Sequence, residues 1–543
     1  MENTAKTSNG ERCQITIKLW PPSENTRLML VERMTNNLST PTIFTRKYGS
    51  LGQPEAAKYA KQIEESAFCS ANQHYEQEPG GGDGSYAVQL YARECSKLIL
   101  EVLKEGAKLE EKEAMKSEVE SAPRETFFDI SKGQRAFIEV DEAQVLLNPL
   151  KEPGNSYTKI CFSNRSFGLG AANVAGPILA SIKNQLKEVD LSDFVAGRPE
   201  AEALDVMNIF SEALEGSHLK YLNISDNALG EKGVRAFAKL LRSQTSLEEL
   251  YLMNDGISKE AAQAVCELVP STDVLKVLHF HNNMTGDEGA IAISEILKRC
   301  PLLEDFRCSS TRVGSEGGIA LTEALAQCKN LKKLDLRDNM FGVEAGVKLS
   351  EALKKHENLT EIYLSYLNLE DDGAVAIANT LKESAPSLAV LEMAGNDITA
   401  EAAPSLAACI TSKKSLVKLN LSENDLKDDG AIQISKAFGE GQDQLKEVDM
   451  SQNSLTTTAR KLAQALVHLP GFKLLNVNGN FISEEDIDEL RSIFKECQEK
   501  LGPLDENDPE GNDFDDSKGG DEDEGSQDEL EEKLKKLDVN QEN

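Results

Sequence analysis

The chain has 543 residues, of which 40% are hydrophobic and 28% are charged, so we expect a large folded core. Its 59 basic and 92 acidic residues give a formal net charge of −33. A surface this acidic repels phosphate backbones and anionic lipids, which argues against nucleic acid as a partner and favours a basic protein.

Residues 1–12 are polar, and we expect them to be disordered. They contain no apolar stretch, so no secretory signal is expected. No run of about 18 apolar residues occurs in the chain, so we also expect no direct membrane insertion.

Residues 13–115 are predicted to form a small helical domain. Apolar residues recur at helical spacing in three segments, over 26–37, from Pro54 and from Ser85. The glycine-rich run at 80–84 lacks the lysine and hydroxyl residue of a phosphate-binding loop, so it is interpreted as a linker.

Residues 116–153 are predicted to be a linker followed by the N-terminal cap of the next domain. The cap runs from Phe127 to Leu150, with Asp141 as the expected N-cap of its helix. At the other end of that domain, residues 483–500 are predicted to form the closing helix.

Residues 154–500 repeat the pattern Leu-x-x-Leu-x-Leu-x-x-Asn. Its second apolar position recurs at residues 160, 189, 222, 250, 278, 306, 334, 362, 391, 419, 448 and 475. The steps are 27 to 29 residues long except for one of 33, between Val189 and Leu222. This period predicts an α/β leucine-rich repeat solenoid of about 12 repeats, with a curved parallel sheet inside and helices outside.

Each part of the repeat has a physical role. The alternating leucines are expected to point inward from a short strand, and the asparagine to bond backbone groups of the turn. Eleven residues after the strand position, in the repeats from Leu222 to Val448, only glycine or alanine occurs, as at Gly233, Ala261 and Gly289. We expect this small residue where the helix packs closely on the strand layer.

Residues 501–543 are predicted to be a disordered acidic tail. From residue 505 onward the segment contains 17 acidic residues and four lysines, and it has little to bury. At most a transient helix is expected at 527–537.

The sequence contains no catalytic, nucleotide-binding or zinc motif, so no cofactor or metal of its own is expected. Ten cysteines occur without a Cys-x-x-Cys pair, which favours a reducing compartment. His279 and His281 are the one close histidine pair, and we interpret them as solvated or partner-facing. A solenoid without such a site is typical of a protein that binds proteins.

The 33-residue step is the first break in the repeat. Its extra residues fall in 192–199 and are predicted to form an enlarged rim loop that projects Arg198 between Gly197 and Pro199. The arginine is either a solvated surface residue, which spacing alone favours, or held out for a phosphate or carboxylate.

The second break lies in the repeat of Leu250. Asp255 takes the position usually held by asparagine, and Asn254 stands one residue earlier. Asn254 is therefore predicted to lie outside the turn's own bonding, with its amide free for a partner. Asn282 is placed similarly, so position alone does not decide the matter.

These segments carry a family resemblance. The run from Phe162-Ser163-Asn164 through Val195-Ala196-Gly197-Arg198 to Leu250-Tyr251-Leu252-Met253-Asn254 resembles the leucine-rich repeat domain of GTPase-activating proteins for the small GTPase Ran. Lys18-Leu19-Trp20-Pro21-Pro22, followed by a helical domain, resembles the WPP targeting domain that plants fuse to this protein. The acidic tail fits the same family.

The resemblance implies a GTPase activator, not an enzyme in its own right, because Ran itself performs the hydrolysis and carries GTP and Mg. Asn254 matches the family's asparagine that orders Ran's catalytic glutamine. Arg198 matches its required arginine, assigned to complex formation or loop support, with an arginine finger as the alternative. The partner is then Ran in its GTP form.

Trp20, Pro21 and Pro22 would bind coiled-coil anchor proteins of the nuclear envelope. The implied locations are the cytoplasm, the cytoplasmic face of the envelope and division-associated structures, in support of nucleocytoplasmic transport and mitosis. Two alternatives stay open: an acidic repeat scaffold or inhibitor that binds a basic protein without catalysis, and a Trp-Pro-Pro lead-in whose tryptophan only covers the first helix.

Overall fold

The computed structural model describes residues 20–39, 52–77, 87–99, 102, 126–270, 272–439 and 441–508. The chain divides into two compact units, Met1–Pro123 and Arg124–Asn543. The predictions for residues 1–12, for the glycine run at 80–84 and for the tail beyond residue 508 lie outside the described residues. Among the helices described, none combines the length and the hydropathy that a membrane crossing needs.

The first unit is helical, as predicted. It contains α1 (Glu24–Ser39), α3 (Gln53–Gln77) and a further helix over 87–99. The alanine-rich stripe of α3 is buried against its neighbours because small side chains let the helices approach closely. Arg27 and Glu64 form an ion pair at 2.6 Å within this unit, and the Tyr91 hydroxyl donates to the same carboxylate.

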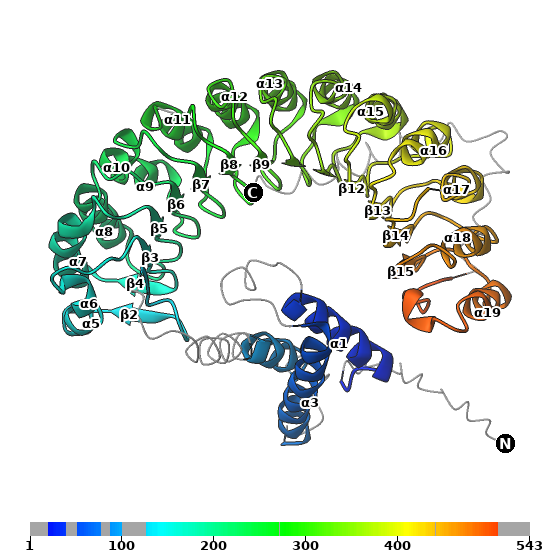
Figure 1. Ribbon diagram of the computed structural model, residues 1–543, viewed down its shortest axis with the longest axis horizontal. Coiled ribbons are helices and arrows are strands. Elements are labelled where there is room, and N and C mark those ends of the chain that lie inside the picture. The colour runs from blue at the N-terminus through cyan, green and yellow to red at the C-terminus, as the bar shows by residue number, and fades with distance from the viewer. Residues whose placement is uncertain are drawn as a thin grey trace, which may run out of the picture. The chain divides into compact units, whose positions relative to one another are not determined.

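The second unit is a solenoid whose strands line the inner side of an arc and whose helices cover the outer side (Figure 1). Within residues 126–508 one parallel sheet follows the chain in order. Its strands are β1 (Phe127–Asp129), β3 (Lys159–Cys161), β5 (Glu188–Asp190), β6 (Tyr221–Asn223), β7 (Glu249–Tyr251), β8 (Val277–His279), β9 (Asp305–Arg307), β10 (Lys333–Asp335), β11 (Glu361–Tyr363), β12 (Val390–Glu392), β13 (Lys418–Asn420), β14 (Glu447–Asp449) and β15 (Leu474–Asn476). A separate pair, β2 (Ala136–Ile138) and β4 (Arg165–Phe167), lies near the N-terminal end.

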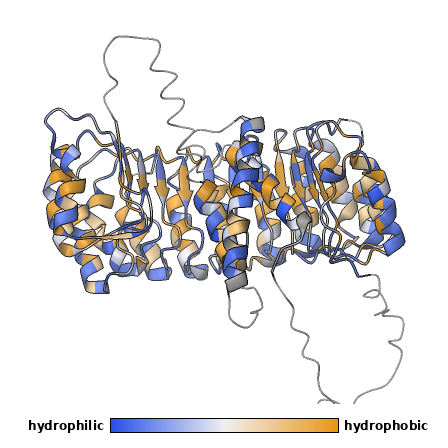
Figure 2. Ribbon diagram, turned by 90° about the horizontal axis from the view of Figure 1, so that it is seen from below, coloured by the Kyte–Doolittle hydropathy of each residue, from blue (hydrophilic) through white to orange (hydrophobic). Residues whose placement is uncertain are grey.

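The helices of the solenoid mix hydrophobic and hydrophilic residues along their length, as expected for a layer with one buried face (Figure 2). They are α5 (Val140–Leu146), α6 (Asn148–Lys151), α7 (Leu169–Ile182), α8 (Glu200–Ala213), α9 (Gly230–Ala236), α10 (Ala238–Arg242), α11 (Lys259–Leu268), α12 (Gly286–Leu297), α13 (Ser315–Leu325), α14 (Gly342–Leu353), α15 (Glu370–Glu383), α16 (Ala403–Ser412), α17 (Lys427–Ser435), α18 (Ala459–Leu466), α19 (Glu484–Ile493) and the 3-10 turn η1 (Gln498–Lys500).

The repeat asparagines form a buried ladder between turns, which confirms their predicted role. Asn283 shows the pattern: its Nδ2 donates to the carbonyl of Leu252 at 2.7 Å, and its Oδ1 accepts from the backbone of Asp255 and Ile257 at 3.0 Å. One amide thereby satisfies backbone groups of two successive repeats that would otherwise be buried without partners.

The small residue of each repeat serves a different contact from the one predicted. A Cβ added at Gly317 would lie 2.8 Å from the Asp287 Cα and 2.9 Å from the Ala290 Cβ, both on the preceding helix. The close approach is therefore between neighbouring helices and not between helix and strand layer. Side chains larger than alanine would separate the helices and open the arc's outer layer.

Both ends of the solenoid extend further than predicted. At the N-terminal end β1 pairs with β3, so the sheet has a strand before the first counted repeat, and the N-cap of α5 is Glu139 while Asp141 lies inside the helix. At the C-terminal end Leu501 bridges to Leu475, and the Asn507 Oδ1 accepts from the Asn480 backbone at 2.9 Å. The ladder thus continues past residue 500, since each turn needs a partner for its backbone groups.

Candidate functional site

Every repeat turns in the same way on one rim, four residues after the central strand position. This residue has a positive φ in each of the twelve predicted repeats: Asn164, Asp193, Asp226, Asn254, Asn282, Ser310, Asp338, Tyr366, Gly395, Glu423, Gln452 and Gly479. The left-handed conformation favours glycine, asparagine and aspartate. Asn254, with φ 53°, therefore has a local structural reason to be asparagine.

Asn254 is exposed on this rim, but its amide is not idle. Its Nδ2 donates to Asp226 Oδ1 at 2.9 Å, and its Oδ1 accepts from Asn282 Nδ2 at 2.9 Å. The prediction of an unbonded amide is wrong, because equivalent side chains of successive repeats stack within hydrogen-bonding distance. One of these bonds joins two amides and the other joins the amide to the Asp226 carboxylate. Both are exposed to water, so their net free energy is small and they can be exchanged for bonds to a partner.

Two hollows flank the Asp226–Asn254 pair. One of about 660 Å³ is lined by the enlarged loop, including Arg198, and by Asp226. The other, of about 530 Å³, is lined by Asn254 together with the exposed side chains of Met284 and Arg312. Asn254 thus stands at the edge of a surface with both apolar and charged groups, which suits a protein partner.

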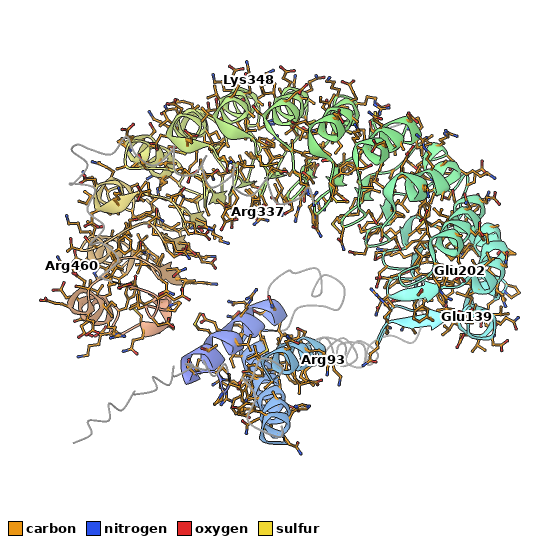
Figure 3. The ribbon with its side chains drawn as sticks, turned by 180° about the vertical axis from the view of Figure 1, so that it is seen from behind. Arg93, Glu139, Glu202, Arg337, Lys348 and Arg460 are labelled. Carbon is orange, nitrogen blue, oxygen red and sulfur yellow. The ribbon has the colours of Figure 1, made fainter. Side chains whose placement is uncertain are left out.

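Arg198 does not project into solvent as predicted. Its side chain is only 10% exposed, pairs with Glu139 at 2.6 Å and donates to the Ser166 carbonyl at 2.8 Å. The guanidinium also lies over the Phe137 ring, 4.8 Å from its centroid. Figure 3 labels Glu139 and Glu202, the two carboxylates near this arginine, at the N-terminal end of the solenoid. The enlarged loop is thereby tied to the cap.

We expect Arg198→Ala to loosen the cap and lower the free energy of unfolding by about 1–3 kcal/mol, because buried acceptors lose their donor. Hydrogen exchange over residues 126–167 measures the loosening. Glu139→Gln, which keeps the shape but removes the charge, is the matched control and should have the smaller effect. Unchanged exchange in Arg198→Ala combined with lost partner binding would instead indicate a direct contact with the partner.

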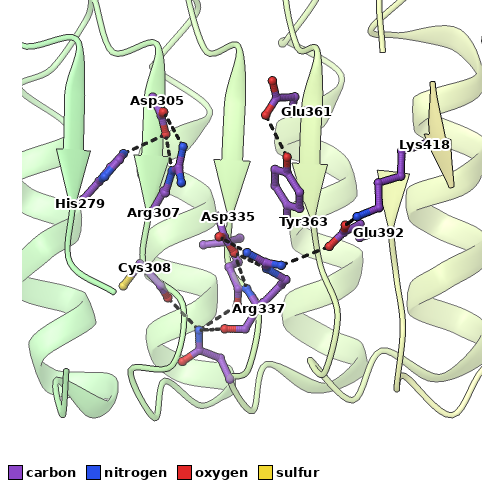
Figure 4. Close-up of polar contacts among 12 residues, drawn as sticks. His279, Asp305, Arg307, Cys308, Asp335, Arg337, Glu361, Tyr363, Glu392 and Lys418 are labelled. Atoms are coloured by element: carbon purple, nitrogen blue, oxygen red, sulfur yellow. Dashed lines mark hydrogen bonds and ion pairs between the residues drawn. The ribbon is translucent and has the colours of Figure 1, made fainter. Parts of the chain in front are cut away.

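The concave face pairs its charges internally over the middle repeats (Figure 4). His279 Nε2 and Arg307 Nε each lie 3.1 Å from Asp305 Oδ1, and Arg337 reaches Glu392 at 3.2 Å. Burial disfavours the charged form of Asp305, but these hydrogen bonds outweigh it and lower the pKa of Asp305 to about 2. Among the described residues, no group of three or more His, Cys, Asp or Glu is placed to hold a metal ion.

Trp20 lies in the core of the first unit. It is 2% exposed, stacks on Phe68 with centroids 5.3 Å apart, and donates from Nε1 to Asn72 Oδ1 at 3.1 Å. Pro21 is exposed and Pro22 half-buried. The burial of Trp20 argues against a direct contact with a partner and fits the alternative in which the tryptophan covers the helices, since its ring fills the space between them.

Comparison with known proteins places these features in a family. The chain is 72% identical to RAN GTPase-activating protein 2 of Arabidopsis thaliana over 499 residues, covering 91% of each chain. The chain belongs to the Ran GTPase-activating proteins. It is also 63% identical to the family member RAN GTPase-activating protein 1 of the same plant over 515 residues, covering 95% of each.

Two family patterns match this Ran GTPase-activating protein, one in each of its two units. The WPP domain pattern matches residues 16–113, and the leucine-rich repeat pattern matches 217–238, 327–350 and 412–435. WPP domain-containing protein 1 of Arabidopsis thaliana is 33% identical over 104 residues, covering 19% of this chain and 65% of that protein. The first unit thus corresponds to the module for which that protein is named.

Sequence reasoning missed Asp226 and Glu139, and it noted Asn282 only as placed similarly to Asn254. Asp226 and Asn282 hold the Asn254 amide, and Glu139 holds Arg198. The 28-residue spacing of Asp226, Asn254 and Asn282 could have indicated the stacked amides. Glu139 carries no such signal, because it belongs to the cap and lies outside the repeat.

Proposed function

We propose that this chain accelerates hydrolysis of GTP bound to the small GTPase Ran. Its membership of the family carries the proposal, and the exposed Asn254 carboxamide on the rim supplies a group suited to the task. GTP and Mg are carried by Ran, whose own residues perform the chemistry, and the chain adds no cofactor.

The mechanism is one of positioning. In such GTPases a glutamine orients the attacking water, and a misplaced glutamine forfeits most of the catalysis. A carboxamide both donates and accepts, so Asn254 can exchange its bonds to Asp226 and Asn282 for bonds to that glutamine. GTPase activation of about 10⁵-fold corresponds to about 7 kcal/mol of barrier, and positioning together with exclusion of water can supply it.

Arg198 acts as a support for the loop rather than as an arginine finger. Its guanidinium already bonds Glu139 and the Ser166 carbonyl, and reaching a phosphate would break both contacts. If Arg198 left these bonds, the enlarged loop would no longer be held to the cap. Arg198 lines the larger hollow, so the wall of that hollow would lose its support. This role fits a requirement for the arginine in complex formation.

Turnover tests the proposal. Catalytic amounts of the full chain are mixed with Ran loaded with GTP, and phosphate release is measured against Ran alone. Many phosphates released per chain support activation. Stoichiometric binding without faster release would instead identify an acidic repeat scaffold or inhibitor and overturn the proposal.

Charge should speed the encounter. A chain with net charge −33 attracts a basic surface on its partner, and salt screens this attraction. We expect the association rate, measured by stopped flow, to fall severalfold between about 50 mM and about 500 mM salt. The dissociation rate is the internal control and should change less. Equal association rates at both concentrations would exclude steering.

The first unit is proposed to target the chain to the cytoplasmic face of the nuclear envelope through coiled-coil anchor proteins, with further locations in the cytoplasm and on division-associated structures. Trp20 would act by holding the helices together. The exposed Leu28 and Met29 of α1 offer apolar side chains to a partner helix. At these locations the chain would support the roles of Ran in nucleocytoplasmic transport and mitosis.

A further inference from the structure

Asp255 occupies a ladder position that is built for an amide. In the repeats on either side, Asn227 donates from Nδ2 to the Ile224 carbonyl at 2.8 Å, and Asn283 donates to the Leu252 carbonyl at 2.7 Å. Each of these side chains also accepts backbone N–H groups through Oδ1. In both neighbouring repeats the side chain at this position therefore supplies a donor as well as an acceptor.

Asp255 in its ionised form supplies the acceptor but not the donor. It is fully buried, and its Oδ1 accepts from the Asn227 backbone at 2.9 Å, as an asparagine oxygen would. Its Oδ2, also buried, has no hydrogen-bond partner among the described residues. This oxygen corresponds to the amide nitrogen of the neighbouring repeats, which is aimed at backbone carbonyls. An ionised carboxylate cannot donate to them.

The surroundings favour the uncharged form. Burial is the largest influence, and the nearby Asp226 carboxylate adds to it, while backbone N–H groups of Asn227 and Leu229 act in the opposite direction. The net result is a pKa of Asp255 well above its ordinary value. Asp226 is the charged group that faces it, and the ladder neighbours Asn227 and Asn283 are uncharged.

We propose that Asp255 keeps a proton on Oδ2 in the folded protein and uses it as the ladder's missing donor, so that a neutral acid positions the turn carrying Asn254. The position of Asn254 depends on two hydrogen bonds made by the adjacent Asp255. The Asp255 N–H donates to Asn283 Oδ1 at 3.0 Å, and Asp255 Oδ1 accepts from the backbone N–H of Asn227 in the preceding turn. Asp255 is thus a positioning residue. Its link to activation rests on the function proposed above for Asn254.

The protonation has a defined pH dependence. The carboxyl's folded pKa is raised above its unfolded value of about 3.9, so its contribution to stability is complete below about pH 4. That contribution is lost as the pH rises through the folded pKa. Asp255→Asn replaces the acid with a permanently neutral donor, so its melting temperature should exceed that of the wild type by a margin that widens with pH.

A second measurement detects the proton itself. The infrared difference spectrum of the wild-type chain minus Asp255→Asn at pH 7 should contain the C=O band of a protonated carboxylic acid. Asn453→Asp is the matched control, because Asn453 occupies the same ladder position, buried and bonded to the Leu421 carbonyl at 2.8 Å, far from Asn254. Asn453→Asp should melt below the wild type by a margin that widens with pH, as expected for a buried acid at this position. It should leave the activation of Ran at neutral pH unchanged.

Activation provides the functional readout. The rate of phosphate release with wild type, divided by that with Asp255→Asn, should fall toward alkaline pH, by about tenfold per pH unit beyond the folded pKa if only the neutral form is competent. Parallel stability curves and no carboxylic acid band would overturn the neutral acid. A band with a constant activity ratio would overturn the positioning role. Absence of activation in both chains would overturn the function proposed above and leave the infrared result standing.

Discussion

Replacing Asn254 with alanine should lower the acceleration of Ran's GTP hydrolysis by about 10²–10³-fold, the loss typical when one positioned catalytic donor is removed. The alanine also enters a left-handed turn, at a cost of about 1–2 kcal/mol. Affinity for Ran should change far less than turnover, since one exposed amide contributes little to a large interface. Single-turnover phosphate release over a range of concentrations separates the two effects.

Two further variants separate the amide from the backbone strain. Asn254→Gly removes the amide but accepts the φ of 53° without strain, so it should lose as much activation as the alanine variant. Gln452→Ala places an alanine in the equivalent turn of a distant repeat, where φ is 50°, and should retain full activation. If Asn254→Gly remained active, the carboxamide would not be the group that acts on Ran.

Replacing Trp20 with alanine should unfold much of the first unit while the solenoid stays folded. Removing a buried tryptophan costs about 3–5 kcal/mol, a large share of the stability of a domain of this size. The lost contacts include stacking on Phe68 and the hydrogen bond to Asn72. Thermal melting and hydrogen exchange of residues 52–99 measure the effect, and activation of Ran in solution should be unchanged.

Pro22→Ala is the matched control for Trp20→Ala. Pro22 is only half-buried, so its replacement should lower the melting temperature of the first unit far less than Trp20→Ala does. We expect loss of nuclear-envelope staining with Trp20→Ala as a result of unfolding. A folded Trp20→Ala chain that still failed to reach the envelope would show that the indole, and not the fold, is what the anchor protein requires.

Asn254 illustrates where sequence reasoning reached its limit. Its position in the repeat, one residue before the ladder, is visible in the sequence because the period is so regular. Its bonds to Asp226 and Asn282 are not, because they depend on how closely successive turns stack. The sequence also names Asp255 as a departure from asparagine, while only the buried, unpartnered Oδ2 indicates what that departure means.

The sequence by itself determined the solenoid, its inward leucines, the asparagine ladder and the helical first unit, because repeated short-range patterns specify local structure and each repeat packs only on its neighbours. Only the tertiary structure showed that the side chains of Arg198 and Trp20 are buried. Arg198 was expected on a projecting rim loop, and for Trp20 the sequence left open whether it binds a partner or covers a helix. Both side chains are buried by partners distant in sequence, Glu139 for the arginine and Phe68 for the tryptophan. Such contacts have no period, so no local pattern could predict them.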